Sequence, residues 1–111
     1  MEQAQPDRNM SVRKREIVEV EASLEPLVPK FMANRKKETA AMRGALAAQD
    51  LDEVRRISHG MKGAGGSYGF DRITDYAAVI EQAAKSADAA VLERTLPLLE
   101  AYLDHIEVRY V

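Results

Sequence analysis

Apolar residues recur three and four positions apart through most of this chain, which is the spacing of one face of an amphipathic helix. The pattern predicts four helices, at residues 23–48, 51–68, 70–85 and 88 to about 110. Because the predicted connections are short, neighbouring helices must fold back on one another, as in an antiparallel four-helix bundle. The fold class expected is therefore all-α, with a single core between the four apolar faces.

Polar side chains and a glycine mark where these helices begin and end. Ser23 is the expected N-cap of the first helix, and Asp50 is expected to cap the second, with Glu53 completing a capping box. Gly69 stands where a left-handed residue would end that helix, and Asp88 is the expected cap of the last one.

Three prolines fall inside the predicted helices. Pro26 is tolerated in the first turn of the first helix, whereas Pro29 is expected to distort its second turn. Pro97 lies inside the apolar face of the last helix, so we expect a kink there or a break just before it.

Residues 1–22 are expected to form an N-terminal tail or arm ahead of a bundle that occupies residues 23–111. Met1 to Arg8 is polar and is expected to be disordered. Residues 13–21 fit either a short helix or an extended arm laid on the bundle, with a hint of strand-forming composition at residues 17–20. The sequence leaves both alternatives open.

Five of the six glycines lie between residues 60 and 69, within or at the end of the second predicted helix. Four glycines inside a helix would cost about 3–4 kcal/mol relative to alanine, which is large against a total stability of about 5–15 kcal/mol. Close helix packing explains Gly65 and Gly69, but Gly63 and Gly66 are expected to face outward. These two predict a bare surface against which a large partner lies flat.

His59 lies on the same outward surface. At about 100° per residue, it falls about 150° from the centre of the buried face. The residues within about 60° of it on the neighbouring turns are Arg55, Arg56, Lys62, Gly63 and Gly66. A histidine side chain is substantially neutral at pH 7, so one ring nitrogen carries a free lone pair, and a lysine one turn on can meet the charge of phosphoryl oxygens. This combination indicates phosphoryl transfer through nitrogen.

No phosphate-binding loop accompanies this site. The glycines lie within a helix rather than between a strand and a helix, and no glycine-rich loop ends in Lys-Ser or Lys-Thr. Catalysis of phosphoryl transfer is mostly positioning and charge stabilisation, so a protein that supplies only a nucleophile and a lysine needs a partner for the rest. Any phosphoryl group is therefore expected to arrive from another protein.

The run from His59 to Phe70, HGMKGAGGSYGF, resembles the signature of histidine-containing phosphotransfer (HPt) domains. That signature is a phosphoacceptor histidine followed by Lys at +3, Gly at +4, +7 and +10, and a hydrophobic residue. The resemblance extends over residues 24–111 and implies a four-helix bundle. It makes His59 the phosphoacceptor, Lys62 the phosphate-side cation, Gly63 the spot where a receiver domain sits, and Gly69 the helix end. Their place on the helix adds three residues to the expected receiver-docking surface: Gly66, Arg55 and Arg56.

The resemblance implies a phosphorelay intermediate in two-component signalling, which takes a phosphoryl group from a receiver-domain aspartate and passes it to another receiver aspartate. Such a protein is not an enzyme with kinase activity and needs no cofactor of its own, because the Mg²⁺ belongs to the receiver. Its partners would be receiver domains, a hybrid histidine kinase, or both, and it would be a monomer. Two alternatives stay open: a helical adaptor that binds a receiver or kinase without being phosphorylated, and a module split from a histidine kinase that serves as its substrate, like the histidine-bearing module of chemotaxis kinases.

Composition argues against several other classes. The chain has no cysteine, which removes disulfides and thiolate metal sites and favours a reducing compartment. Its net charge of −2 argues against nucleic-acid binding, despite basic clusters at residues 13–15 and 35–37. No apolar run is long enough to span a bilayer and no apolar leader follows Met1, so a cytoplasmic protein is expected.

The charged residues also have simpler interpretations. Three cations near His59 could be ordinary solvated charges paired with Asp52 or Glu53: Arg55, Arg56 and Lys62. His105, on the last predicted helix, lies off the apolar face and is taken as a surface residue. A metal site that joins the two histidines is not expected, because neither has a second ligand at helical spacing.

Overall fold

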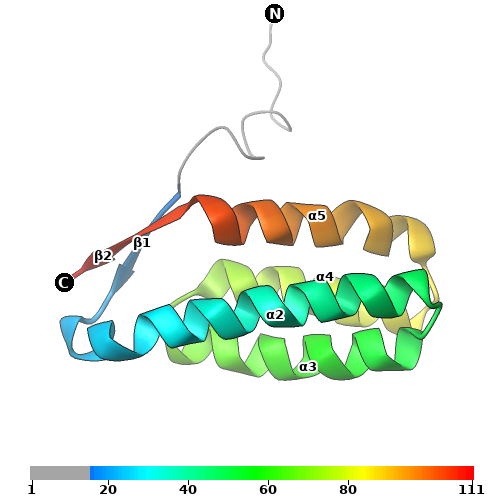
Figure 1. The fold of residues 1–111 in the computed structure, drawn as a ribbon, viewed down its shortest axis with the longest axis horizontal. Helices are drawn as coiled ribbons and strands as arrows, with labels where there is room; N and C mark the ends of the chain where they lie inside the picture. The colour runs from blue at the N-terminus through cyan, green and yellow to red at the C-terminus, as the bar shows by residue number, and fades with distance from the viewer. Residues whose placement is uncertain (1–15) are drawn as a thin grey trace, which may run out of the picture.

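Four long helices and a small two-stranded sheet make up residues 16–111, the part of the chain that the computed structural model describes (Figure 1). In chain order the elements are β1 (Glu16–Val20), the 3₁₀ helix η1 (Ala22–Leu27), α2 (Val28–Ala47), α3 (Leu51–Ser67), α4 (Asp71–Lys85), α5 (Ala89–His105) and β2 (Ile106–Tyr110). The predicted helical bundle is confirmed, since the helices lie alongside one another with short connections at the ends of the bundle. The sequence pattern gives only a hint of β1, at residues 17–20, and does not predict β2 or its pairing with β1.

One apolar core lies between the four helices. Each helix contributes side chains that are almost fully buried: Phe31 and Met42 from α2, Val54 and Met61 from α3, Ile73 and Ile80 from α4, and Leu92, Leu96 and Leu99 from α5. The three-and-four spacing of apolar residues thus reports the inner face of each helix. α3 packs against both α2 and α4, and its remaining side faces solvent.

The expected side-chain caps of α3 and α5 are confirmed, but the capping box is not completed, because the N–H of Asp50 donates to the carbonyl of Ala45 and the side chain of Glu53 pairs with Arg56. The side chain of Asp50 accepts a hydrogen bond from the backbone N–H of Glu53 at 3.2 Å, and Asp88 does the same for the N–H of Val91 at 3.2 Å.

Gly69 follows the end of α3 with a φ of 86°, in the left-handed region where glycine carries no steric penalty. Close helix packing, the other expectation for Gly69, is wrong, because a Cβ there would make only an ordinary contact of 3.7 Å with the carbonyl oxygen of Glu19.

The start of α2 differs from the prediction. Ser23 is not an N-cap: its hydroxyl donates to the side chain of Glu21, and the chain runs as the 3₁₀ helix η1 until Leu27. The α-helix begins only at Val28, which puts Pro29 in its first turn and leaves Pro26 inside η1. The physical reason is that a proline lacks a backbone N–H, and that loss costs nothing in the first turn, where no helical acceptor exists for it.

The end of the last helix also differs. α5 ends at His105 rather than near Tyr110, and residues 106–110 form β2. Ile106 continues the helical spacing of the apolar face, but Ile106, Val108 and Tyr110 also alternate with polar residues, as in a half-buried strand. The local pattern therefore fits both structures, and pairing with β1 decides between them.

Pro97 does not break α5. The helix runs unbroken from Ala89 to His105, so the expected break before the proline is wrong. Pro97 removes one helical hydrogen bond, but Leu96 and Leu99 on either side of it are buried in the core and hold the helix in place.

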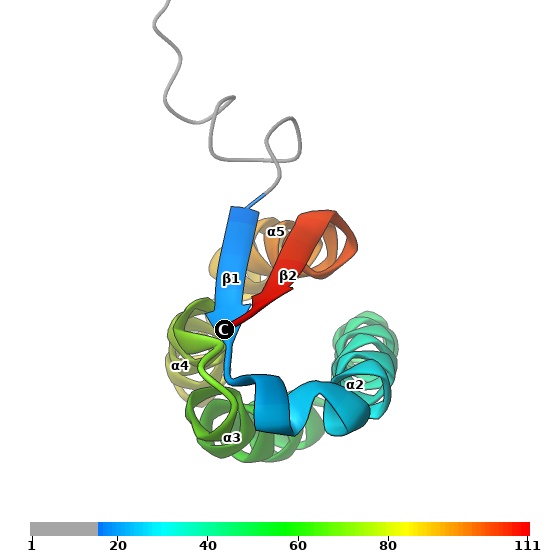
Figure 2. The ribbon, with the colours of Figure 1, turned by 90° about the vertical axis from the view of Figure 1, so that its left-hand side faces the viewer.

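β1 and β2 pair in parallel, in register from Glu16 opposite Ile106 to Val20 opposite Tyr110. Figure 2 looks onto this end of the bundle, where the two strands lie in front of α5 and η1 leads across to α2. Of the two alternatives for residues 13–21, the structure therefore has the extended one over residues 16–20. Residues 13–15 and the expected disordered tail at Met1 to Arg8 lie outside the described residues.

Candidate functional site

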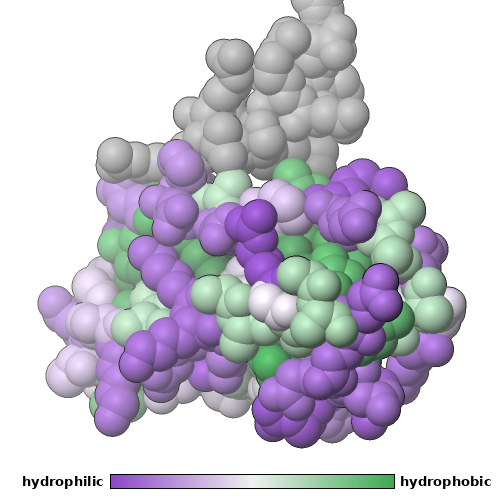
Figure 3. Space-filling model, turned by 45° about the vertical axis from the view of Figure 1, so that its right-hand side comes forward, coloured by the Kyte–Doolittle hydropathy of each residue, from purple (hydrophilic) through white to green (hydrophobic). Residues whose placement is uncertain are grey.

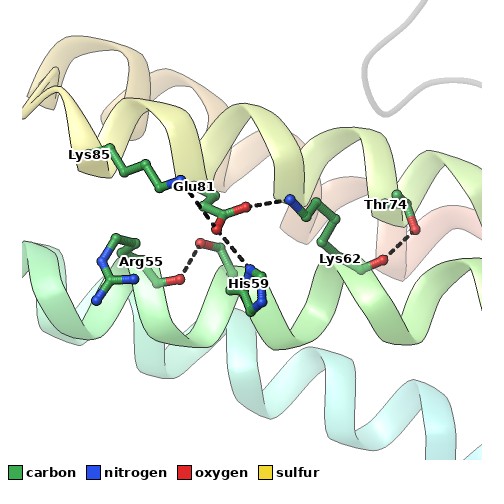
Figure 4. Close-up of polar contacts among 7 residues, drawn as sticks. Arg55, His59, Lys62, Thr74, Glu81 and Lys85 are labelled. Atoms are coloured by element: carbon green, nitrogen blue, oxygen red, sulfur yellow. Dashed lines mark hydrogen bonds and ion pairs between the residues drawn. The ribbon is translucent and has the colours of Figure 1, made fainter.

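The imidazole of His59 projects from the solvent-facing side of α3, and 68% of its side chain is exposed. This confirms the orientation expected from the helical projection. The ring is not isolated, however. Figure 4 shows it turned towards α4, where the carboxylate of Glu81 points at one of its nitrogens.

Glu81 is the central residue of the site. Its side chain is only 7% exposed, because it lies on the side of α4 that packs against α3. One carboxylate oxygen, Oε2, lies 2.9 Å from Nδ1 of His59, and the other, Oε1, lies 2.7 Å from Nζ of Lys62. A second ammonium, Nζ of Lys85, lies 3.9 Å from Oε2 (Figure 4). A single carboxylate therefore joins the histidine to two lysines.

The charge state of Glu81 determines which nitrogen of His59 is free. The hydrogen bond from Lys62 lowers the pKa of Glu81, burial acts in the opposite direction, and the hydrogen bond with His59 lowers it further. The carboxylate is therefore ionised at neutral pH and can only accept hydrogen bonds. It follows that Nδ1 of a neutral His59 carries the proton and donates it to Glu81, which leaves the lone pair on Nε2.

Lys62 is held at both ends. Its ammonium contacts Glu81, and its backbone carbonyl accepts a hydrogen bond from the hydroxyl of Thr74 at 2.9 Å. The side chain is 39% exposed, so the ammonium remains accessible beside the imidazole. The simpler interpretation, in which Lys62 pairs with Asp52 or Glu53, is not what the structure contains.

Glu81 is not among the residues predicted from the sequence, although the sequence holds a signal for it. Glu81 continues the apolar series Ile73 and Ala77 at intervals of four residues, so it occupies a position on the inward side of α4. A carboxylate at such a position needs a partner, since burying an unpaired charge is costly. The pattern could not identify His59 as that partner, because the two lie on different helices.

The glycines of α3 divide into two kinds. A Cβ added at Gly65 would lie 2.6 Å from the hydroxyl of Thr74 and 3.1 Å from the carbonyl oxygen of Phe70, so Gly65 is required for the close approach of α4. A Cβ at Gly66 would make only an ordinary contact of 3.9 Å with Thr74. Nothing lies within 4 Å of a Cβ added at Gly60 or Gly63, so these positions are bare, as expected for Gly63.

The two arginines differ in their contacts. Arg56 forms an ion pair with Glu53, with Nε and Oε1 2.9 Å apart, which matches the simpler interpretation of a solvated charge pair. Arg55 is exposed one turn before His59, and within residues 16–111 its guanidinium has no ion-pair partner. Arg55 is therefore the cation of this pair that is available to a ligand.

His105 lies apart from this site. Its Nδ1–H donates to the carbonyl of Ala101 within α5, at 2.9 Å. Across residues 16–111, no three side chains of His, Cys, Asp or Glu gather as metal ligands. No helix in that range is long and apolar enough to cross a lipid bilayer.

This arrangement is suited to a reaction at Nε2. When Nε2 forms a bond to an electrophile, the imidazole gains positive charge, and the carboxylate of Glu81 on Nδ1 stabilises that charge. Lys62 and Lys85 place two ammonium groups beside the same carboxylate, where an anionic group could contact them. The site thus combines an exposed nucleophile with a fixed tautomer and nearby cations.

A family model for the Hpt domain matches residues 27–108. This range includes the four long helices and all the residues of the site. Comparisons with curated proteins and with solved structures gave no match.

Proposed function

The chain belongs to the Hpt-domain family, which acts in the phosphorelays of two-component signalling, and on this premise we propose that His59 carries the phosphoryl group. In this proposal His59 accepts the group from the aspartate of one receiver domain and passes it to the aspartate of another. The observation that carries the proposal is the contact of 2.9 Å between Glu81 and Nδ1, which leaves Nε2 exposed as the nucleophile.

The step is a transfer between two carriers. The lone pair of Nε2 attacks the phosphorus of the aspartyl phosphate, so that an N–P bond forms as the O–P bond breaks, and the receiver carboxylate leaves with the bonding electrons. The proton stays on Nδ1, where the carboxylate of Glu81 balances the positive charge of the phosphorylated ring. Transfer to the next receiver reverses these changes, with the carboxylate of that receiver as the nucleophile.

The lysines stabilise the transferred group. Catalysis of phosphoryl transfer is mainly positioning and charge stabilisation, and Lys62 supplies a cation beside the imidazole. Its ammonium contacts the other oxygen of the carboxylate that Nδ1 contacts, so Glu81 holds both groups before any phosphoryl group arrives. Lys85 contacts Glu81 more loosely and is 53% exposed, so it is free to move towards the phosphoryl oxygens.

The remaining requirements fall on the partner. We infer that the protein has no kinase activity and no cofactor of its own, and that the Mg²⁺ belongs to the receiver. It acts as a monomer in the cytoplasm on receiver domains, on a hybrid histidine kinase, or on both. Gly63, Gly66, Arg55 and Arg56 contribute to the surface that the receiver contacts.

Labelling experiments test this function. The protein is incubated with a receiver domain carrying a labelled aspartyl phosphate, and the expected result is label on the protein that is labile to acid and stable to base. Binding of the receiver without any transfer of label would favour the adaptor. Label acquired from a histidine kinase and ATP, but never from a phosphorylated receiver, would favour the kinase-substrate module.

A further inference from the structure

Thr74 connects α4 to the backbone of α3 beside the site. Its hydroxyl donates a hydrogen bond to the carbonyl of Lys62 at 2.9 Å (Figure 4). A carbonyl inside an α-helix is already paired with the N–H four residues further on, and its second lone pair can accept another hydrogen bond. The hydroxyl is therefore not needed to satisfy α3, and what its contact does is join the two helices.

Gly65 makes this contact possible. A Cβ at that position would lie 2.6 Å from the hydroxyl oxygen of Thr74 and 3.0 Å from its backbone nitrogen. The N–H of Phe70 donates to the carbonyl of Gly65 at 3.0 Å, so the turn into α4 is fastened at the same residue. Gly65 and Thr74 are thus a matched pair, because the missing side chain of one leaves the space that the hydroxyl of the other occupies.

Thr74 and Glu81 both contact α3, at two levels of the same pair of helices. They are seven residues apart on α4, which is two turns and about 10 Å along the helix axis. On α3, His59 lies six residues before Gly65, or about 9 Å along the axis. The spacing on the two helices therefore matches, and any sliding or rotation of α4 against α3 would move both contacts together.

The charged contacts of Glu81 are poorly suited to fix this offset. The ammonium groups of Lys62 and Lys85 are partly exposed, and ion pairs at a surface contribute little because water competes for both partners. Strongly polar side chains interleave with apolar ones over the face of the molecule in Figure 3, so a lysine at the surface has alternative partners. Thr74 differs, because its short side chain binds a backbone atom whose position is set by α3 itself.

We propose that Thr74 is a positioning residue for phosphotransfer, which acts on His59 through Glu81. Its hydroxyl fixes the offset of α4 against α3, and that offset brings the carboxylate within 2.9 Å of Nδ1. N–H···O hydrogen bonds span only about 2.7–3.2 Å, so a small displacement of α4 would release the imidazole and its tautomer. The inference rests on the proposed function, and it adds the contact that prepares the nucleophile before a donor arrives.

Threonine variants isolate the hydroxyl of Thr74. Thr74→Val removes it and keeps the shape of the side chain, whereas Thr74→Ser keeps it. Thr39→Val is the matched control, because the hydroxyl of Thr39 also donates to a backbone carbonyl at 2.9 Å, but to that of Arg35 within α2. Thr74→Ala removes the same hydroxyl without adding an atom, and it repeats the test if Thr74→Val alters the circular dichroism spectrum.

The first measurement is the tautomer of His59, which needs no phosphoryl group. Imidazole ¹⁵N chemical shifts are recorded at about pH 8.5, well above the ordinary pKa of histidine, so that the ring is neutral. The signals of His105, identified with the His59→Gln variant, are the internal reference. Thr74→Val is expected to lower the ratio of the Nδ1–H to the Nε2–H tautomer by about twofold or more, whereas Thr74→Ser and Thr39→Val leave it unchanged.

The second measurement is the single-turnover rate of transfer from a receiver domain that phosphorylates the wild-type protein. Thr74→Val is expected to slow transfer by about fivefold or more, while Thr74→Ser and Thr39→Val stay within about twofold of wild type. The substitution is then combined with Glu81→Ala. If Thr74 acts through Glu81, its effect disappears in that background, whereas a residue that only stabilises the fold causes the same loss in both.

Either a wild-type tautomer ratio or a wild-type transfer rate in Thr74→Val would overturn the inference, and so would an equal loss of transfer with and without Glu81. Failure of the wild-type protein to take label from a phosphorylated receiver would instead refute the proposed function, while the tautomer ratio would still test the link between Thr74 and Glu81. The two failures are thus distinguishable.

Discussion

Glu81 on α4 accepts a hydrogen bond from Nδ1 of His59 on α3, with the two atoms 2.9 Å apart. The carboxylate is buried while the imidazole is largely exposed, so the contact holds an accessible ring by a fixed group. It specifies the tautomer, orients Nε2 to solvent, and places a negative charge where the reacting ring becomes positive.

We expect His59→Gln to abolish phosphorylation without loss of the fold, because the side chain is exposed and contributes little to the core. His105→Gln should be labelled like wild type, since His105 contacts only Ala101 within its own helix. Labelling of the two variants by a phosphorylated receiver, together with their circular dichroism spectra, checks this. Label on His59→Gln would show that another residue is the acceptor.

Glu81→Gln should slow transfer by about tenfold, because one charged hydrogen bond is worth about 1.5 kcal/mol in the transition state. The amide can still accept from Nδ1 but carries no charge to stabilise the phosphorylated ring. Glu81→Ala should be slower still, since it also releases the tautomer and the orientation of His59. Single-turnover transfer rates measure both effects, and equal rates for wild type and both variants would mean that Glu81 has only a structural role.

Lys62→Ala should slow transfer by roughly one to two orders of magnitude, the effect of one electrostatic contact of about 1.5–3 kcal/mol. The reason is that Lys62 lies beside the imidazole and belongs to the site rather than to the core. Lys36→Ala is a suitable control, because Lys36 pairs with Asp104 on another face of the molecule. An unchanged rate for Lys62→Ala would mean that Lys62 has no role in transfer and is an ordinary solvated charge.

The stability of the fold should depend on the ionisation of Glu81. Its pKa in the folded protein is lowered from 4.5, chiefly by the hydrogen bond from Lys62. A lowered pKa means that the folded state binds protons less readily than the unfolded state, so this stabilisation is present above about pH 4.5 and is lost as the pH falls through the folded value.

Glu81→Gln tests that linkage. The free energy of unfolding, measured by denaturant titration, should fall less steeply between pH 5 and pH 3 in this variant than in the wild type. Parallel pH profiles for the two proteins would contradict the assignment.

Gly63 and Gly65 should respond in opposite ways to the same substitution. Gly63→Ala meets no atom and replaces a poor helix former, so it should raise the stability by up to about 1 kcal/mol. Gly65→Ala should destabilise, because its Cβ would collide with Thr74 and with the carbonyl oxygen of Phe70. Thermal unfolding of both variants checks the contrast.

Gly63→Gln separates docking from folding. The side chain enters open space, so the fold should persist while receiver binding or transfer weakens. Receiver binding and the melting temperature are the two measurements. Unfolding of Gly63→Gln would mean that this glycine serves an internal contact, and the bare docking surface would lose its main support.

The spacing of residues along the chain predicts the four helices, the caps at Asp50 and Asp88 and the exposure of His59, although the start of α2 and the end of α5 differ from the prediction. Each of these depends on residues close together in the chain: Asp50 and Asp88 cap the helices that follow them, and the position of His59 around α3 follows from the apolar residues of the same helix. Lys62 and Gly63 could be placed beside His59 for the same reason. Their roles in phosphotransfer came from the resemblance to HPt domains and stay a proposal.

The partner of His59 and the conformation of residues 106–110 depend on contacts between elements that are distant in the chain. The contact with Glu81 depends on the rotation and offset of α4 against α3, two helices that approach closely at Gly65 and Thr74. The sequence between Ile106 and Tyr110 fits a helix or a strand, and it becomes a strand because β1, far away in the chain, supplies the hydrogen bonds. Local spacing records which face of an element is buried, but it carries no information on which distant element lies against that face.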